Sequence, residues 1–158
     1  MRGRVLWLRA GLLYLAVVNA SVGIWASVAP RSFYDDFPGG GHSWVSVDGP
    51  FNEHLVRDVG AWSLGITVVI LAALWTMSRP LVITTGAAVT VLSLPHALYH
   101  SRHADVIGPA VDQALSIGGL YLATAVGAAV LVGALRLEPD PDQAAERRRV
   151  AAGADTDE

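Results

Sequence analysis

The chain has 158 residues, the length of one ordinary domain, and a formal net charge of −3. Hydrophobic residues make up 53% of it and charged residues 16%, whereas soluble domains average roughly 45–50% and 25%. The absence of cysteine excludes disulfides, thiolate metal sites and thiol nucleophiles. The apolar residues gather in blocks, which is typical of an integral membrane protein.

Four blocks approach the ~20 residues that a helix needs to cross a bilayer core of ~30 Å. They predict an all-α, polytopic fold, a four-transmembrane-helix bundle over residues 1–137, with helices at about 6–29, 51–78, 80–103 and 112–136. The first block follows three arginines and resembles a signal peptide. Because its apolar stretch is too long for one and Pro30 follows the candidate cleavage site, we expect a retained helix.

Arginine placement predicts the orientation of the bundle. Eight arginines fall on the side of the termini and three on the opposite side. By the positive-inside rule, both termini are cytoplasmic. The eight are Arg2, Arg4, Arg9, Arg79, Arg136, Arg147, Arg148 and Arg149, and the three are Arg31, Arg57 and Arg102.

The connections between the helices differ in length. The first is a long outer loop over residues 30–50, too rich in aromatic residues for a disordered linker, and we expect it to pack across the outer mouth of the bundle. The second is a tight inner turn in which Pro80 restarts the helix. This turn makes the second and third helices antiparallel neighbours.

The C-terminal stretch 138–158 begins with two prolines and ends in acidic residues. We expect a largely disordered cytoplasmic tail. Its three consecutive arginines are read as a topology signal with some attraction to anionic lipid. Nothing in the chain predicts a nucleic-acid partner.

Small residues at a spacing of four lie on the fourth helix, at Gly119, Ala123 and Gly127. Such a ladder lets another helix approach closely. Besides the lipid bilayer, it predicts a homo-oligomer or a membrane-complex partner at this face. Asn19, within the first helix, is expected to hydrogen-bond across to a neighbouring helix.

Three histidines share one face at the outer end of the third helix, provided that this helix continues through Pro95. His96, His100 and His103 fall within about 60° of one another at 100° per residue. His96 and His103 are about 10.5 Å apart along the axis, so we expect one ion to bind two adjacent histidines, either His96 with His100 or His100 with His103. The remaining ligands must come from another helix.

The start of the second helix offers those ligands. His54 and Asp58 lie four apart on one face, with Glu53 and Arg57 paired on the neighbouring face. The predicted metal site therefore comprises His54, Asp58, His96, His100 and His103, between helices two and three on the extracytoplasmic side. Imidazole with one carboxylate suits a divalent transition metal such as zinc, copper or iron.

Several alternatives stay open. The histidines suit a simple interfacial position near lipid headgroups, and the chain suits a non-enzymatic subunit or scaffold of a cell-envelope complex. Haem is less favoured, because bis-histidine ligation usually needs two helices facing inside a bundle. Uncharged spans argue against a transporter. No arrangement here identifies a reaction, although an oxidoreductase or a hydrolase would suit the metal site.

The run Val59-Gly60-Ala61-Trp62 follows a polar, arginine-bearing stretch at the start of the second predicted helix. The chain also has four short predicted helices and a long first outer loop. In these features the chain resembles the DoxX-like group of small bacterial membrane proteins. The resemblance covers most of residues 1–137 and implies a four-helix bundle in the bacterial plasma (inner) membrane. It implies no functional residues.

Overall fold

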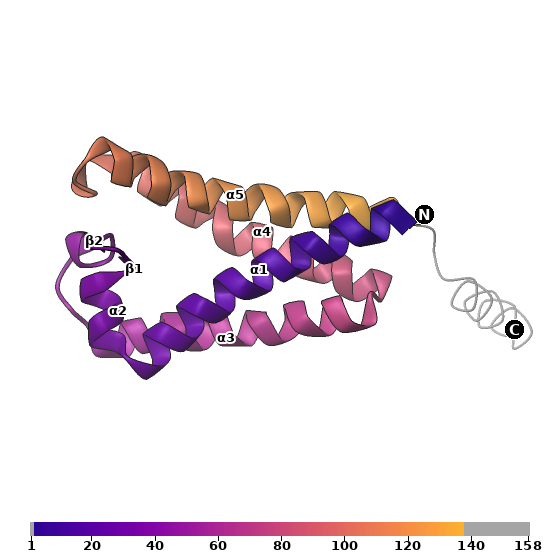
Figure 1. Ribbon diagram of the computed structural model, residues 1–158, viewed down its shortest axis with the longest axis horizontal. Coiled ribbons are helices and arrows are strands. Elements are labelled where there is room, and N and C mark those ends of the chain that lie inside the picture. Colours follow the sequence, from indigo (N-terminus) through magenta and orange to yellow (C-terminus); the bar gives the residue numbers. More distant parts are fainter. Residues whose placement is uncertain (1, 138–158) are drawn as a thin grey trace, which may run out of the picture.

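The structure is a computed structural model that describes residues 2–137, so the predicted tail lies outside the described part of the chain. Four long helices dominate it: α1 (Arg2–Val28), α3 (Glu53–Thr76), α4 (Arg79–Arg102) and α5 (Ala110–Leu135) (Figure 1). All four are long and apolar enough to cross a membrane. The predicted helices are confirmed, with bounds shifted by a few residues.

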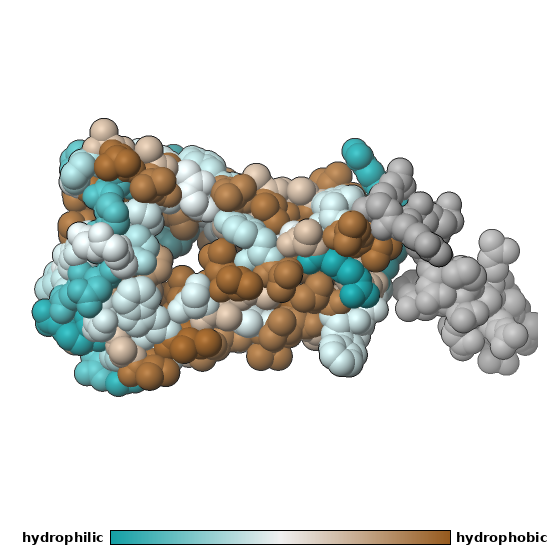
Figure 2. Space-filling view, viewed as in Figure 1, coloured by the Kyte–Doolittle hydropathy of each residue, from teal (hydrophilic) through white to brown (hydrophobic). Residues whose placement is uncertain are grey.

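Large apolar side chains lie exposed along these helices. Trp62 is 75% exposed, Trp75 88% and Val91 71%. Figure 2 shows apolar side chains over the length of the bundle and hydrophilic ones concentrated at the end that carries the long loop. A water-soluble domain does not expose so much continuous apolar surface, whereas lipid covers it without cost. The architecture is that of a multi-pass membrane protein.

The helices pack as two antiparallel pairs, α1 with α3 and α4 with α5. A glycine permits the close approach in each pair. A Cβ at Gly60 of α3 would lie 2.7 Å from the Ser27 nitrogen of α1, and a Cβ at Gly86 of α4 would lie 2.6 Å from the Leu131 nitrogen of α5. Backbone therefore touches backbone in both pairs, as small residues allow in membranes.

Within residues 2–137, the core that the two pairs share extends from one end of the bundle toward its middle. We call that end the hairpin end, because it holds the turn between α3 and α4, and we call the opposite end the loop end. The shared core joins all four long helices through Leu8, Leu12, Leu15, Ala16, Ile70, Ala73, Val82, Val89, Val130 and Ala134. Toward the loop end the pairs diverge, and Figure 2 shows the surface hollowed between them.

Residues at the helix ends explain where the helices begin and end. The Asn52 side chain accepts a hydrogen bond from the Leu55 N–H at 3.1 Å and so caps the start of α3. Pro80 lies in the first turn of α4, where its missing N–H leaves no hydrogen bond unmade. As predicted, α4 continues through Pro95 to Arg102.

Two arginines bind carbonyl groups at the ends of partner helices. Arg57 Nη1 of α3 donates to the Ser27 carbonyl oxygen of α1 at 2.6 Å, and Arg79 Nη2 of α4 donates to the Leu135 carbonyl oxygen of α5 at 3.2 Å. A cation at a helix C-terminus complements the helix dipole and satisfies orphan carbonyls. Each arginine therefore fastens one end of a helix pair.

The loop between α1 and α3 is an ordered unit, which we call the connecting arm (residues 29–52). It contains a helix that the sequence did not predict, α2 (Pro30–Asp36), and two short antiparallel strands, β1 (Pro38–Gly39) and β2 (His42–Ser43). A 3₁₀ turn, η1 (Ser46–Asp48), precedes α3, and a second, η2 (Ala104–Val106), lies between α4 and α5. Phe33 of α2 forms a buried cluster with Ala26 of α1 and Val56 of α3, and this cluster holds the arm against both helices.

Two expectations about polar and small residues need correction or refinement. Asn19 Nδ2 donates to the Leu15 carbonyl of its own helix at 2.8 Å, so the predicted bond across helices is wrong. Gly127 packs against Val89 and Thr90 of α4, whereas a Cβ at Gly119 would meet nothing within 4 Å in residues 2–137 beyond its own stretch of helix. In the predicted ladder, Gly127 therefore makes a contact inside the bundle, whereas Gly119 lies at an open surface.

Candidate metal centre at the loop end

Two of the predicted ligands lie side by side on α4. The Nε2 atoms of His96 and His100 are 3.0 Å apart, and their ring centroids are 4.8 Å apart. The helix produces this contact because residues four apart lie one above the other on the same face. His96 is exposed and His100 is half-buried, so a ligand can reach the pair from the side that faces away from the helix.

The other nitrogen of His100 is directed away from this pair. Its Nδ1 atom is buried and has no hydrogen-bond partner within residues 2–137. A buried, unpaired ring nitrogen is uncommon in proteins and needs an explanation. It leaves Nε2 as the nitrogen through which His100 can meet a ligand.

His103 lies one turn further along the same helix and is held differently. Its Nδ1 atom is 2.9 Å from the Tyr99 carbonyl oxygen, and its ring stacks on the Tyr99 ring at 4.4 Å. Since the carbonyl only accepts, Nδ1 carries the proton and Nε2 is left as an electron-pair donor. The Tyr99 ring also meets His100 edge-on at 5.4 Å, so it contacts both imidazoles.

The remaining predicted ligands form a separate pair on α3. His54 Nε2 lies 3.3 Å from Asp58 Oδ2, with side chains 88% and 49% exposed. As predicted, Arg57 Nε donates to Glu53 Oε1 at 2.8 Å on the neighbouring face. The predicted pairs His96–His100, His54–Asp58 and Glu53–Arg57 are thus present, whereas His103 contacts Tyr99 and makes no hydrogen bond with His100 within residues 2–137.

The structure does not gather the five predicted ligands into one cluster. Within residues 2–137, no three His, Asp or Glu side chains lie close enough together to hold a metal ion. The reason is the pairing of the helices: α3 packs mainly on α1, and α4 packs mainly on α5. The tight turn keeps α3 and α4 adjacent at the hairpin end, but it does not keep their loop ends together.

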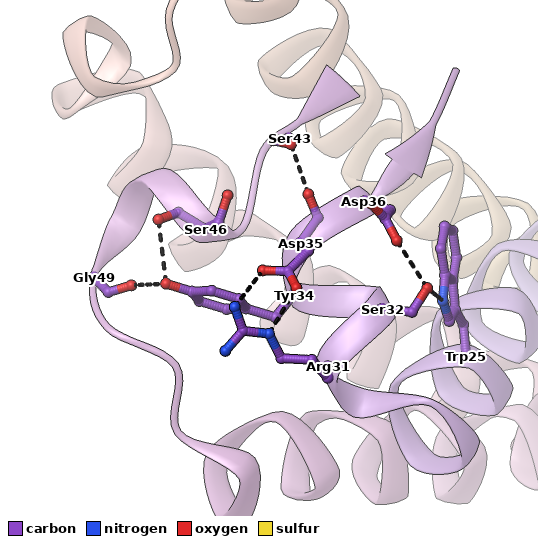
Figure 3. A network of polar contacts seen from close by, with 9 residues as sticks. All are labelled: Trp25, Arg31, Ser32, Tyr34, Asp35, Asp36, Ser43, Ser46 and Gly49. Carbon is purple, nitrogen blue, oxygen red and sulfur yellow. Dashed lines mark hydrogen bonds and ion pairs between the residues drawn. The ribbon is translucent and has the colours of Figure 1, made fainter. Parts of the chain in front are cut away.

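The connecting arm is held together by its own polar contacts (Figure 3). Tyr34 lies at its centre, and its hydroxyl donates to the backbone carbonyl oxygens of Ser46 and Gly49. Arg31 donates to both carboxylate oxygens of Asp35, at 2.6 and 3.1 Å. This hydrogen bonding with the Asp35 carboxylate raises the pKa of the Arg31 guanidinium.

Two contacts join this arm to the other helix pair, and sequence reasoning missed both. His42 Nδ1 of β2 lies 2.6 Å from Asp112 Oδ1 of α5, and the Asp112 side chain is only 13% exposed. Tyr99 Oη of α4 lies 3.4 Å from Asp48 Oδ1 of η1. The sequence indicated that histidines and acidic residues gather at the outer end of the bundle, but it could not show which of them would contact each other.

The geometry of the His96–His100 pair is compatible with two chemical states. At 3.0 Å, one ring can donate its Nε2–H to the other. Two nitrogens that bind one zinc ion at about 2.0–2.1 Å, at angles of about 90–110°, are themselves roughly 2.9–3.4 Å apart. A metal ion can therefore take the place of the shared proton with little movement of the rings.

Comparison with known proteins gives no relative to set beside this site. No protein-family model, no curated protein and no solved structure matches the chain.

Proposed function

We propose that this chain is a multi-pass membrane protein that binds a divalent transition metal at its loop end, through His96 and His100. The observation that carries the proposal is the 3.0 Å separation of the two Nε2 atoms. Zinc, copper and iron all accept imidazole ligands, and two histidines leave positions for a carboxylate and for water or substrate. Haem does not suit the pair, because two neighbours on one helix cannot occupy opposite axial positions.

The location of the pair supports the same proposal. A histidine pair that faced only lipid headgroups would have no need of a covering segment, yet the connecting arm reaches α4 at Tyr99, within the same turn. The excess of arginine near the termini supports an orientation with the loop end outside the cytoplasm. We accordingly propose an extracytoplasmic metal site in a bacterial plasma membrane, in a protein of the DoxX-like type.

Metal titration of the full chain, purified in mild detergent without a histidine tag, tests the proposal. We expect near-stoichiometric binding of Zn²⁺ or Co²⁺, lost in the double variant His96→Ala/His100→Ala. The matched control is His54→Ala/His103→Ala, which removes two imidazoles and leaves the close pair. Equal loss of metal in both double variants would show that the close pair has no special role.

A second function is favoured by one observation on α5. Beyond their own stretch of helix, a Cβ added at Gly118 or Gly119 would meet nothing within 4 Å in residues 2–137, and Leu115 and Leu122 beside them are 53% and 52% exposed. Such a surface allows a helix of a second copy or of another membrane protein to approach closely. On this alternative the chain is a subunit of an envelope complex, and cross-linking at position 119 tests it.

A further inference from the structure

A carboxylate of the connecting arm, and not one of α3, reaches the turn of α4 that carries His100. Asp48 Oδ1 lies 3.4 Å from Tyr99 Oη, and the Tyr99 ring meets His100 edge-on. Asp58, the carboxylate expected from the sequence, lies instead on α3 beside His54.

The backbone around Asp48 is held in place. Its N–H donates to the Val45 carbonyl oxygen at 3.2 Å, within the 3₁₀ turn η1. The Tyr34 hydroxyl donates to the carbonyl oxygens of Ser46 and Gly49, on either side of this residue (Figure 3). Asp48 is therefore presented on a braced turn, and its position depends on the arm as a whole.

The Asp48 side chain is free to bind a further partner. It is exposed and belongs to no ion pair within residues 2–137, whereas Asp35, Asp58 and Asp112 each face a basic side chain. Its contact with Tyr99 is long for a bond between oxygen atoms, which usually measures about 2.5–3.0 Å. A carboxylate has about four acceptor positions, so most of its capacity is unused.

From this juxtaposition we infer that Asp48 is the third protein ligand of a divalent metal held by His96 and His100. The inference rests on the proposed function and extends it. Asp48 must leave Tyr99 and turn toward the imidazoles, because within residues 2–137 the three groups are not yet close enough to hold an ion. Two imidazoles and one carboxylate leave a fourth position open, as in catalytic zinc sites.

Such a ligand has a mechanical consequence. The arm is buried against α1 and α3, while the histidines belong to α4. A metal bound by both would join the two helix pairs at the loop end, away from the core that they share at the hairpin end. Metal binding is then expected to hold the arm closed over the hollow between the pairs.

Zinc binding to the full chain in detergent tests this inference, with two measurements. We expect Asp48→Asn to weaken Zn²⁺ binding at least about tenfold. Loss of a residue that only orients a metal ligand commonly costs that much, and loss of a ligand itself should cost no less. Asp58→Asn, which removes a carboxylate beside a different histidine, should bind Zn²⁺ as the wild type does. Amide hydrogen exchange within residues 38–48 should slow on adding Zn²⁺ to the wild type and stay unchanged in Asp48→Asn.

The outcomes separate the two proposals. If His96→Ala/His100→Ala abolishes binding while Asp48→Asn has wild-type affinity and wild-type protection of the arm, the third ligand is misassigned and the proposed function stands. If Asp58→Asn weakens binding as much as Asp48→Asn, the ligand is not specific to the arm. If the wild type binds neither Zn²⁺ nor Co²⁺, both proposals fail together.

Discussion

His42 Nδ1 lies 2.6 Å from Asp112 Oδ1, and this contact joins the connecting arm to the start of α5. Apart from this contact and the one between Asp48 and Tyr99, the arm packs against the α1–α3 pair, where Phe33 is buried. Because the core that the two helix pairs share extends from the hairpin end toward the middle of the bundle, polar contacts across the loop end determine how far apart the pairs stand there. His42 and Asp112 are thus placed to fasten the arm across the opening.

We predict that His42→Ala/Asp112→Asn frees the arm without unfolding the bundle. A half-buried polar contact of this kind contributes about 1–1.5 kcal/mol, so amide exchange within residues 38–48 should rise roughly fivefold to tenfold. Exchange in the middle of α1 and α5 should not change. The control is His54→Ala/Asp58→Asn, which removes a His–Asp contact within α3. Unchanged exchange in the arm would show that His42 and Asp112 do not hold it.

Tyr34→Phe should loosen the arm from within. The substitution removes the hydroxyl that donates to the Ser46 and Gly49 carbonyls and leaves the ring, which packs against Phe51 at 5.3 Å. We expect a loss of about 1 kcal/mol in the stability of the arm, measured as faster proteolysis within residues 38–48. Tyr14→Phe is the control, since that ring packs on the core of the hairpin end. Equal proteolysis of both variants would argue against the bracing role.

The helices could be predicted from the sequence because their signals are local. Uncharged runs indicated four spans, and Asn52, Pro80 and the residues around them marked where two helices begin. The arm was harder to predict. Its helix α2 has only seven residues and depends on burial of Phe33 beneath Trp25 and Phe37, contacts that no periodic pattern announces.

The site was predictable only within single helices. The pairs His96–His100 and His54–Asp58 follow from the spacing of four, which every α-helix turns into a contact. Whether these two residue pairs lie near each other depends on which helices pack together. The short turn between α3 and α4 suggested that these two helices are each other's main neighbour, which is wrong. Gly60 and Gly86 direct α3 to α1 and α4 to α5 through backbone contact, a preference that their residue type alone does not specify.

Gly86→Leu should disrupt the α4–α5 pair. Its side chain would meet the backbone of Leu131 and Gly127, which cannot move aside without separating the helices. Overpacking of this kind typically costs about 1–3 kcal/mol, and we expect a lower melting temperature in detergent. Gly119→Leu adds the same side chain to the same helix pair, but at an open surface, and should leave the melting temperature near the wild-type value. A similar loss in both variants would contradict the proposed backbone contact.

The absence of cysteine permits a direct test of the predicted orientation. Single-cysteine variants at Ser43, in the arm, and at Ser78, in the turn at the hairpin end, place one thiol at each end of the bundle. Because arginines are concentrated toward the hairpin end and the termini, that end should face the cytoplasm. In intact cells, an impermeant maleimide should label Ser43→Cys and should not label Ser78→Cys until the membrane is permeabilised. The reverse pattern would place the histidine pair on the cytoplasmic side, where a different pool of metal ions and ligands would reach it.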